Sequence, residues 1–200
     1  MAIIHPTKEA LINVVLDLLK TESLVEVHSE EVLHKSGISK GSMYHHFEDF
    51  QDLLEQAQVR RYGAFVDSSI VSITQLLVIE GKEEFKIALR SITQEIQSPN
   101  LKQQRLHRVK AIAAAEMSPR MQKYMAVEQE RLNLALTDLF RELQHRGWSN
   151  PKLEPRTLAI FFQAITIGQI VNDYADTQLN VDNWYWLLNS IMEELVLKTE

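Results

Sequence analysis

Apolar residues recur three and four positions apart along nearly the whole chain, and strictly alternating runs rich in β-branched residues are missing. This pattern predicts an all-α fold of about nine helices. The first is predicted from Thr7 to Lys20, with Thr7 as its N-cap and Leu11 and Val15 in its buried stripe. A longer helix is predicted to start around residues 50–52 and to run towards the middle of the chain. The other predicted helices span residues 30–36, 40–46, 82–97, 101–117, 119–146, 155–175 and 181–198.

Two local signals mark helix ends in the second half of the chain. Ser118 directly precedes Pro119, which is the arrangement of an N-cap residue before a proline at the first helical position. Gly147 follows Arg146 and suits the left-handed conformation that often ends a helix. We therefore expect a long helix bounded by these two signals.

The segment 29–47 predicts two short helices joined by a tight turn. Ser29 is expected to cap the first helix and Ser39 the second. Gly37 lies between them and supplies the positive φ that reverses the chain direction. The segment therefore has the pattern of a helix-turn-helix.

The second short helix is predicted to have an apolar inner side and a polar outer side. Ile38 and Met43 have the spacing of a hydrophobic staple, and Met43 and Phe47 are four residues apart and should both face inward. A helix of this size fits the major groove of DNA and would present polar groups near its N-terminus. The residues left on the acid-free outer side are Lys40, Ser42, Tyr44 and His45.

Residues 37–47, with Leu53 and Leu54 shortly afterwards, closely resemble the signature of the TetR family of transcriptional regulators. The resemblance covers roughly Thr7 to Tyr62. It implies a DNA-binding domain over residues 1–50, with a three-helix helix-turn-helix, and a helical bundle for ligand binding and dimerisation over residues 51–200. The residues that it implies for DNA binding are Ser39, Lys40, Gly41, Ser42, Tyr44, His45 and His46.

Two positions depart from that signature. Leu33 replaces the small alanine that family members usually carry between the two helices, so we expect slightly wider packing there. Phe50 replaces a lysine that usually opens the next helix and contacts phosphate, so one backbone anchor is missing.

The charge of the chain opposes nucleic-acid binding except at this segment. The net charge is −6, so any attraction to DNA must be local. Residues 34–46 contain Lys35, Lys40 and three histidines but no acid. We therefore expect modest, pH-sensitive affinity and a shallow salt dependence, with a slope of log affinity against log salt no steeper than about −6.

The C-terminal part offers two further candidate sites. An effector pocket is predicted from adaptable methionines and aromatic rings, although a stripe at this spacing also suits an ordinary core. A dimer interface is predicted on the last two helices, whose apolar surface exceeds the needs of one bundle face, with an internal core as the alternative. The pocket residues are Phe65, Phe85, Met117, Met121, Tyr124, Met125 and Trp148, and the interface residues are Phe161, Phe162, Ile165, Gly168, Trp184, Leu188 and Ile191.

Several functional classes lack support in the sequence. Cysteine is absent, which removes disulfides and thiolate metal sites, and we expect no metal and no cofactor. Neither a membrane-spanning stretch nor a secretory signal is recognisable, so the expected location is the cytoplasm. The basic cluster over residues 102–110 is read as a solvated helix face in preference to a second anion-binding surface.

Together these patterns predict a ligand-responsive, non-enzymatic repressor that binds a palindromic operator in double-stranded DNA as a homodimer. One alternative is a helical-bundle enzyme, but the Glu-x-x-His pair of Glu31 and His34 lies inside the helix-turn-helix. The other alternative is a protein-interaction adaptor that uses the same head.

Overall fold

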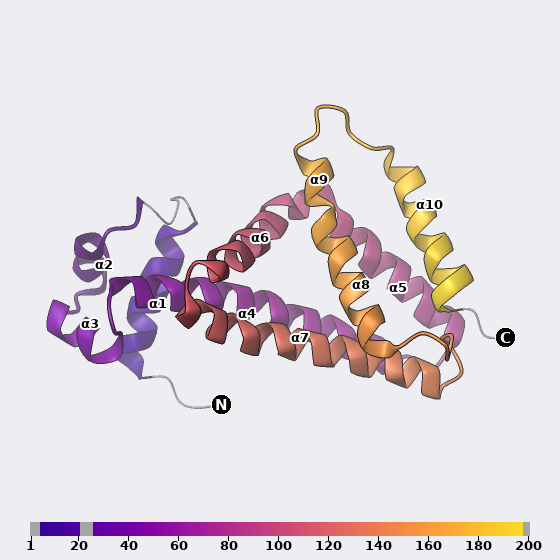
Figure 1. Ribbon diagram of the computed structural model, residues 1–200, viewed down its shortest axis with the longest axis horizontal. Coiled ribbons are helices and arrows are strands. Elements are labelled where there is room, and N and C mark those ends of the chain that lie inside the picture. Colours follow the sequence, from indigo (N-terminus) through magenta and orange to yellow (C-terminus); the bar gives the residue numbers. More distant parts are fainter. Residues whose placement is uncertain (1–4, 21–25, 198–200) are drawn as a thin grey trace. The chain divides into compact units, whose positions relative to one another are not determined.

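The computed structural model describes residues 5–20 and 26–197, and all regular structure within those ranges is helical (Figure 1). The predicted all-α fold is therefore confirmed. The four-residue helix α9 directly follows α8, so the predicted helix 155–175 corresponds to both. The α-helices are α1 (Pro6–Leu18), α2 (Ser29–Ser36), α3 (Lys40–His46), α4 (Phe50–Leu77), α5 (Lys82–Gln97), α6 (Lys102–Glu116), α7 (Pro119–His145), α8 (Pro155–Gly168), α9 (Ile170–Asp173) and α10 (Val181–Ile191).

The chain forms two compact units. The first unit comprises Met1–Phe65 and Ala111–Glu128, and the second comprises Val66–Lys110 and Gln129–Glu200. Helices α4, α6 and α7 each contribute residues to both units. The predicted boundary between residues 50 and 51 is a functional division and stays a prediction.

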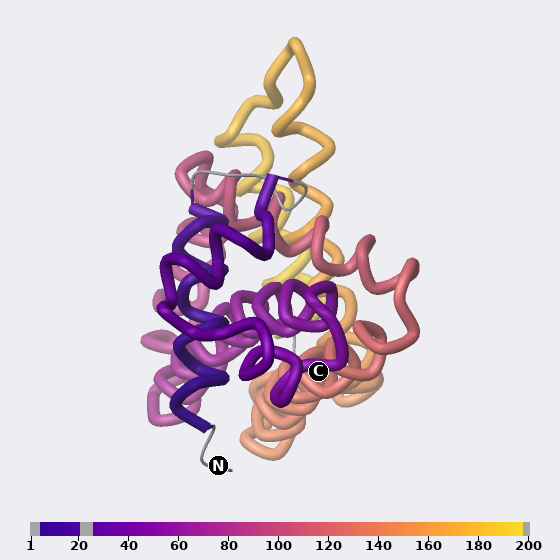
Figure 2. The backbone as a smooth tube through the Cα atoms, turned by 90° about the vertical axis from the view of Figure 1, so that its left-hand side faces the viewer, coloured from indigo at the N-terminus to yellow at the C-terminus, as the bar shows by residue number. Residues whose placement is uncertain are grey.

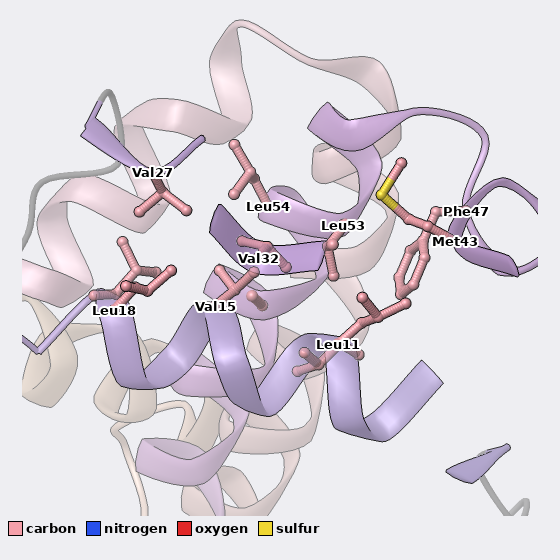
Figure 3. Close-up of a cluster of buried hydrophobic side chains, with 12 residues drawn as sticks. Leu11, Val15, Leu18, Val27, Val32, Met43, Phe47, Leu53 and Leu54 are labelled. Atoms are coloured by element: carbon pink, nitrogen blue, oxygen red, sulfur yellow. The ribbon is translucent and has the colours of Figure 1, made fainter. Parts of the chain in front are cut away.

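A hydrophobic cluster holds the helix-turn-helix in the first unit (Figure 3). Helix α1 contacts both α2 and α3, which lie with it around the start of α4 (Figure 2). Met43 and Phe47 are buried in this cluster, as their spacing predicts. Other members are Leu11, Val15, Leu18, Val27, Val32, Leu53 and Leu54.

The helix caps confirm some sequence predictions and correct others. Ser39 caps α3 through its hydroxyl, which accepts a hydrogen bond from the Ser42 amide at 3.2 Å. Ser118 likewise accepts from the Met121 amide. Two predicted caps are wrong: His5 caps α1 in place of Thr7, and α2 begins at Ser29 itself, after His28.

In the second unit, α8 packs on α7 and α10 packs on α5. The Phe140 and Phe162 rings lie 5.1 Å apart between centroids, and the Trp184 indole donates to Gln97 at 3.3 Å. The predicted helix 181–198 is too long, because α10 ends at Ile191 and continues as a π-helical turn, Met192–Val196. Residue 198 lies outside the described residues. Within the described ranges, no helix is both long and apolar enough to cross a membrane.

Candidate nucleic-acid interface

The turn between α2 and α3 has the rigid geometry that the sequence predicts. Gly37 adopts φ 66°, a left-handed conformation that is costly for residues with a Cβ, and its amide donates to the His34 carbonyl. The Ser36 hydroxyl accepts from the Ile38 amide at 3.3 Å. With Ser39 capping α3, each side of the turn is fixed by hydrogen bonds, so α3 leaves it in a defined direction.

Helix α3 turns its polar side to solvent. Tyr44 is 49% exposed, and Lys40 and His45 are also exposed. The Lys40 ammonium lies 6.0 Å from the centroid of the Tyr44 ring, at the outer limit of a cation–π contact. Of the other candidate residues, Ser39 and Gly41 are exposed, whereas Ser42 and His46 are partly buried.

Three imidazole rings gather at the end of α3. The centroid of the His46 ring lies 4.5 Å from that of His5 and 5.1 Å from that of His45. Desolvation lowers the pKa of His46, and the neighbouring His5, His45 and Lys8 lower it further. Sequence reasoning missed His5 and Lys8, because only the tertiary contact of α1 with α3 brings them to this surface.

An acidic loop follows α3, and Arg120 from the start of α7 pairs with it inside the same unit. Arg120 donates from Nε to Glu55 at 2.8 Å, from Nη1 to Glu48 at 2.8 Å and from Nη2 to Asp49 at 3.1 Å. Its Nε also lies 3.6 Å from Asp52 Oδ1. These carboxylates raise the pKa of Arg120 above its already high value.

The loop is also held by its own hydrogen bonds. The Asp52 amide donates to the Asp49 carboxylate at 2.6 Å, and this bond, with help from Arg120, lowers the pKa of Asp49. The Glu48 amide donates to Asp52 Oδ2 at 3.1 Å. Sequence reasoning missed this cluster, because Arg120 is 65 to 72 residues away from its partners.

The predicted pocket residues divide between the two units. In the first unit Met121 and Met125 are buried, and the Tyr124 hydroxyl donates to Asp52 at 3.3 Å, whereas Met117 is 85% exposed. Phe65 also lies in this unit and is partly buried. In the second unit, Phe85 and Trp148 pack with ring centroids 5.7 Å apart. The effector pocket stays a prediction.

The predicted interface residues include both exposed and internal side chains. Phe161 is 38% exposed and Gly168 is also exposed, while Leu188 is buried inside its own unit. Phe162, Ile165, Trp184 and Ile191 are partly buried. Other exposed apolar side chains on the same two helices are Ile160, Trp186 and Leu187.

Arg105 and Arg108 of the basic cluster at residues 102–110 are buried, so the expectation of a solvated helix face is wrong for these two residues. Arg105 is 2% exposed and forms a two-pronged ion pair with Asp173, with distances of 2.9 and 2.8 Å. Its Nη1 also donates to the carbonyls of Ile96 and Ser98. The charge of Arg105 is therefore compensated by Asp173 within the second unit.

Two observations bear on the alternative of a helical-bundle enzyme with a di-metal site. The Glu31 carboxylate of the Glu-x-x-His pair in α2 lies 2.8 Å from the Lys35 ammonium, in an ordinary ion pair one helical turn apart. Across residues 5–20 and 26–197, no three His, Cys, Asp or Glu side chains gather in a way that could hold a metal ion.

The fold is that of the TetR-family transcriptional regulators. A TetR-family regulator from Mesorhizobium loti superposes with a TM-score of 0.69 at 18% identity, covering 94% of each chain. Escherichia coli NemR in its reduced form has a TM-score of 0.67 at 17% identity, covering 98% of this chain and 99% of its own. A regulator from Saccharomonospora viridis in complex with choline has a TM-score of 0.68 at 16% identity, covering 96% and 97%.

At these identities the likeness concerns the fold. No protein-family model matches the sequence, and no curated protein does either. The structural neighbours are transcriptional regulators, and they confirm, at the level of fold, the family resemblance seen in residues 37–47.

Proposed function

We propose that this chain is a ligand-responsive transcriptional repressor that binds a palindromic DNA operator as a homodimer. The observation that carries the proposal is the outer side of α3, which is polar, free of acids and exposed on a helix held by a capped, rigid turn. Lys40, Gly41 and Ser42 contact base edges, while Tyr44 and His45 contact bases or phosphates.

The histidine group extends this proposed surface onto α1. His5 stacks beside His46, and the Lys8 ammonium lies 5.3 Å from the centroid of the Phe47 ring. His5, the N-cap residue of α1, and Lys8 of α1 are basic side chains, so they suit phosphate contacts that fix the register of α3 on the duplex. In this proposal α1 replaces the phosphate anchor that is missing at Phe50.

Regulation requires a ligand that distinguishes two conformations of the dimer. In the proposal, two recognition helices lie about 34–36 Å apart on the operator, and the effector favours a different separation. The structural neighbour that contains choline supports ligand binding in this fold, without naming the effector of this chain. Operator titration with and without a candidate ligand checks the switch, and ligand binding with unchanged operator affinity would contradict it.

The decisive test of DNA binding is selection from random duplex DNA with the full chain. We expect a palindromic consensus with half-sites about one helical turn apart. The double substitution Tyr44→Ala with His45→Ala should abolish binding to that consensus while leaving folding and dimerisation intact. The matched control replaces two exposed residues of α7, Gln122→Ala with Lys123→Ala, and should bind normally.

The same experiment separates the alternatives. An adaptor or a helical-bundle enzyme would yield no consensus, and the activity of an enzyme would be indifferent to Tyr44 and His45. Absence of any enriched sequence from the folded protein would therefore overturn the proposed function.

A further inference from the structure

Four carboxylates follow the proposed recognition helix within nine residues, and the two exposed ones would approach the phosphates of a bound duplex. The side chains of Glu48 and Asp49 are 75% and 53% exposed, whereas those of Asp52 and Glu55 are 4% and 3% exposed. The exposed pair begins two residues after His46. Because charges within a Debye length of about 8 Å interact through solvent, an uncompensated loop here would repel DNA.

Arg120 reaches all four of these carboxylates. Its guanidinium pairs with Glu55, Glu48 and Asp49 at 2.8 to 3.1 Å and with Asp52 at 3.6 Å. Its backbone position is fixed, because Ser118 caps α7 and Pro119 occupies the first helical position. The planar, permanently charged fork of arginine suits several carboxylates at once, in a way that lysine does not.

The contact also determines the shape of the loop. Asp52 accepts from the Glu48 amide and from the Tyr124 hydroxyl, so the buried carboxylate is part of the turn that joins α3 to α4. Phe47, the last residue before that turn, is buried in the core beneath α3. Losing the positive charge at Arg120 would therefore affect both the charge and the position of the end of the recognition helix.

We propose that Arg120 is a positioning residue for operator binding: it offsets part of the negative charge of the acidic loop after α3 and holds that loop in the conformation that lets α3 enter the groove. This inference rests on the proposed function. It assigns to the start of α7 a role in DNA affinity without any contact between Arg120 and DNA.

The test measures operator affinity for the full chain at several salt concentrations, with the selected consensus as the probe. Arg120→Gln should weaken binding about tenfold at low salt, because several phosphates then face unneutralised carboxylates. The deficit should shrink as salt rises, since screening weakens the repulsion. Arg131→Gln is the matched control, because it removes the same charge from the same helix, where Arg131 pairs with Asp67. Its affinity should stay within about twofold of the unchanged chain.

A second variant leaves Arg120 and its contacts with the buried Asp52 and Glu55 unchanged, so it is expected to fold. Glu48→Gln with Asp49→Asn should strengthen operator binding, and the same pair added to Arg120→Gln should return the affinity to near that of the unchanged chain. This rescue would not occur if Arg120 served only to stabilise the fold.

Two results would overturn the inference while leaving the proposed function intact: an Arg120→Gln chain with unchanged affinity, or a deficit that neither salt nor the acid-neutralising pair reduces. If Arg120→Gln does not fold, the acid-neutralising pair alone decides, and unchanged affinity overturns the inference. An unchanged chain that binds no DNA overturns both proposals.

Discussion

His46 occupies an unusual electrostatic position for a residue of a proposed DNA-binding surface. Desolvation lowers its pKa, and so do the groups that face it: His5 at the N-cap of α1, His45 on its own helix and Lys8 on α1. All of these groups are cationic when protonated. A phosphate placed beside them would supply the missing negative charge and would raise the pKa again.

DNA binding should therefore take up protons. Since the complex binds more protons than the separate protein, operator affinity should rise as pH falls from about 8 to about 6, by up to about tenfold per pH unit for each proton taken up. Fluorescence anisotropy with a labelled operator at several pH values measures this. His46→Gln should flatten the profile, whereas His34→Gln, which changes a histidine of α2 outside the group, should alter it less.

The contribution of His46 to folding stability should depend on pH in the opposite direction to operator affinity. A histidine whose pKa is lower in the folded chain binds more protons when unfolded, so its contribution to stability is present above the unfolded pKa of about 6.5 and is lost below it, as pH falls through the lower pKa of the folded chain. Denaturant unfolding over the same pH range distinguishes the two effects. Operator affinity that falls together with stability on acidification would contradict the proposed role of the histidines.

At the scale of the element, α3 is too short to be stable by itself. It has seven residues, and a helix of this length is held by its cap and by tertiary packing. The Ser39 hydroxyl supplies the cap, and Met43 anchors the helix in the core. Ser39 is also exposed on the proposed DNA-binding surface, so we expect this residue to contribute both to folding stability and to DNA binding.

Two substitutions at Ser39 separate these roles. Ser39→Ala removes the cap and should lower the free energy of unfolding by about 1 kcal/mol. Ser39→Asp keeps a capping oxygen and should leave stability nearly unchanged, while its negative charge faces the phosphates and weakens operator binding. Denaturant titration and operator titration of both variants check this. Equal operator affinity of Ser39→Asp and the unchanged chain would argue against α3 entering the groove.

At the scale of the whole molecule, exposed apolar side chains on α8 and α10 favour self-association. Phe161 is 38% exposed and Trp186 is 70% exposed, and Gly168 leaves room for a helix to approach closely. Leu188 is already covered within its own unit, so we expect the exposed residues to dominate an interface.

A charged residue at Phe161 should therefore break the proposed dimer. Phe161→Glu would bury an unpaired carboxylate at a two-fold interface, so sedimentation should show monomers and operator affinity should fall with it. Ile87→Glu is the control, because Ile87 is also an exposed apolar residue, 66% accessible, but belongs to α5. A dimer that persists in the Phe161→Glu chain would place the interface elsewhere.

Sequence reasoning predicted the local features of this chain well. The bounds of α3 and α5, the left-handed Gly37 and Gly147, and the caps at Ser39 and Ser118 all follow from interactions between residues a few positions apart. The caps of α1 and α2 were wrong by one or two positions: the His5 side chain caps α1 in place of Thr7, and α2 begins one residue early, after His28, without a side-chain cap. Of the residues predicted to contact DNA, Lys40, Tyr44 and His45 are exposed, whereas Ser42 and His46 are partly buried, and their contacts with DNA stay a prediction.

What the sequence alone determined is thus the helical fold, the helix-turn-helix and its polar outer side, since these depend on spacing along the chain. Only the tertiary structure placed His5 beside His46, Arg120 among four carboxylates and Arg105 against Asp173. The sequence alone does not show whether a charged side chain is solvated or buried. Packing between helices far apart in the chain determines which group each charged side chain pairs with, and therefore which charges remain available to a ligand.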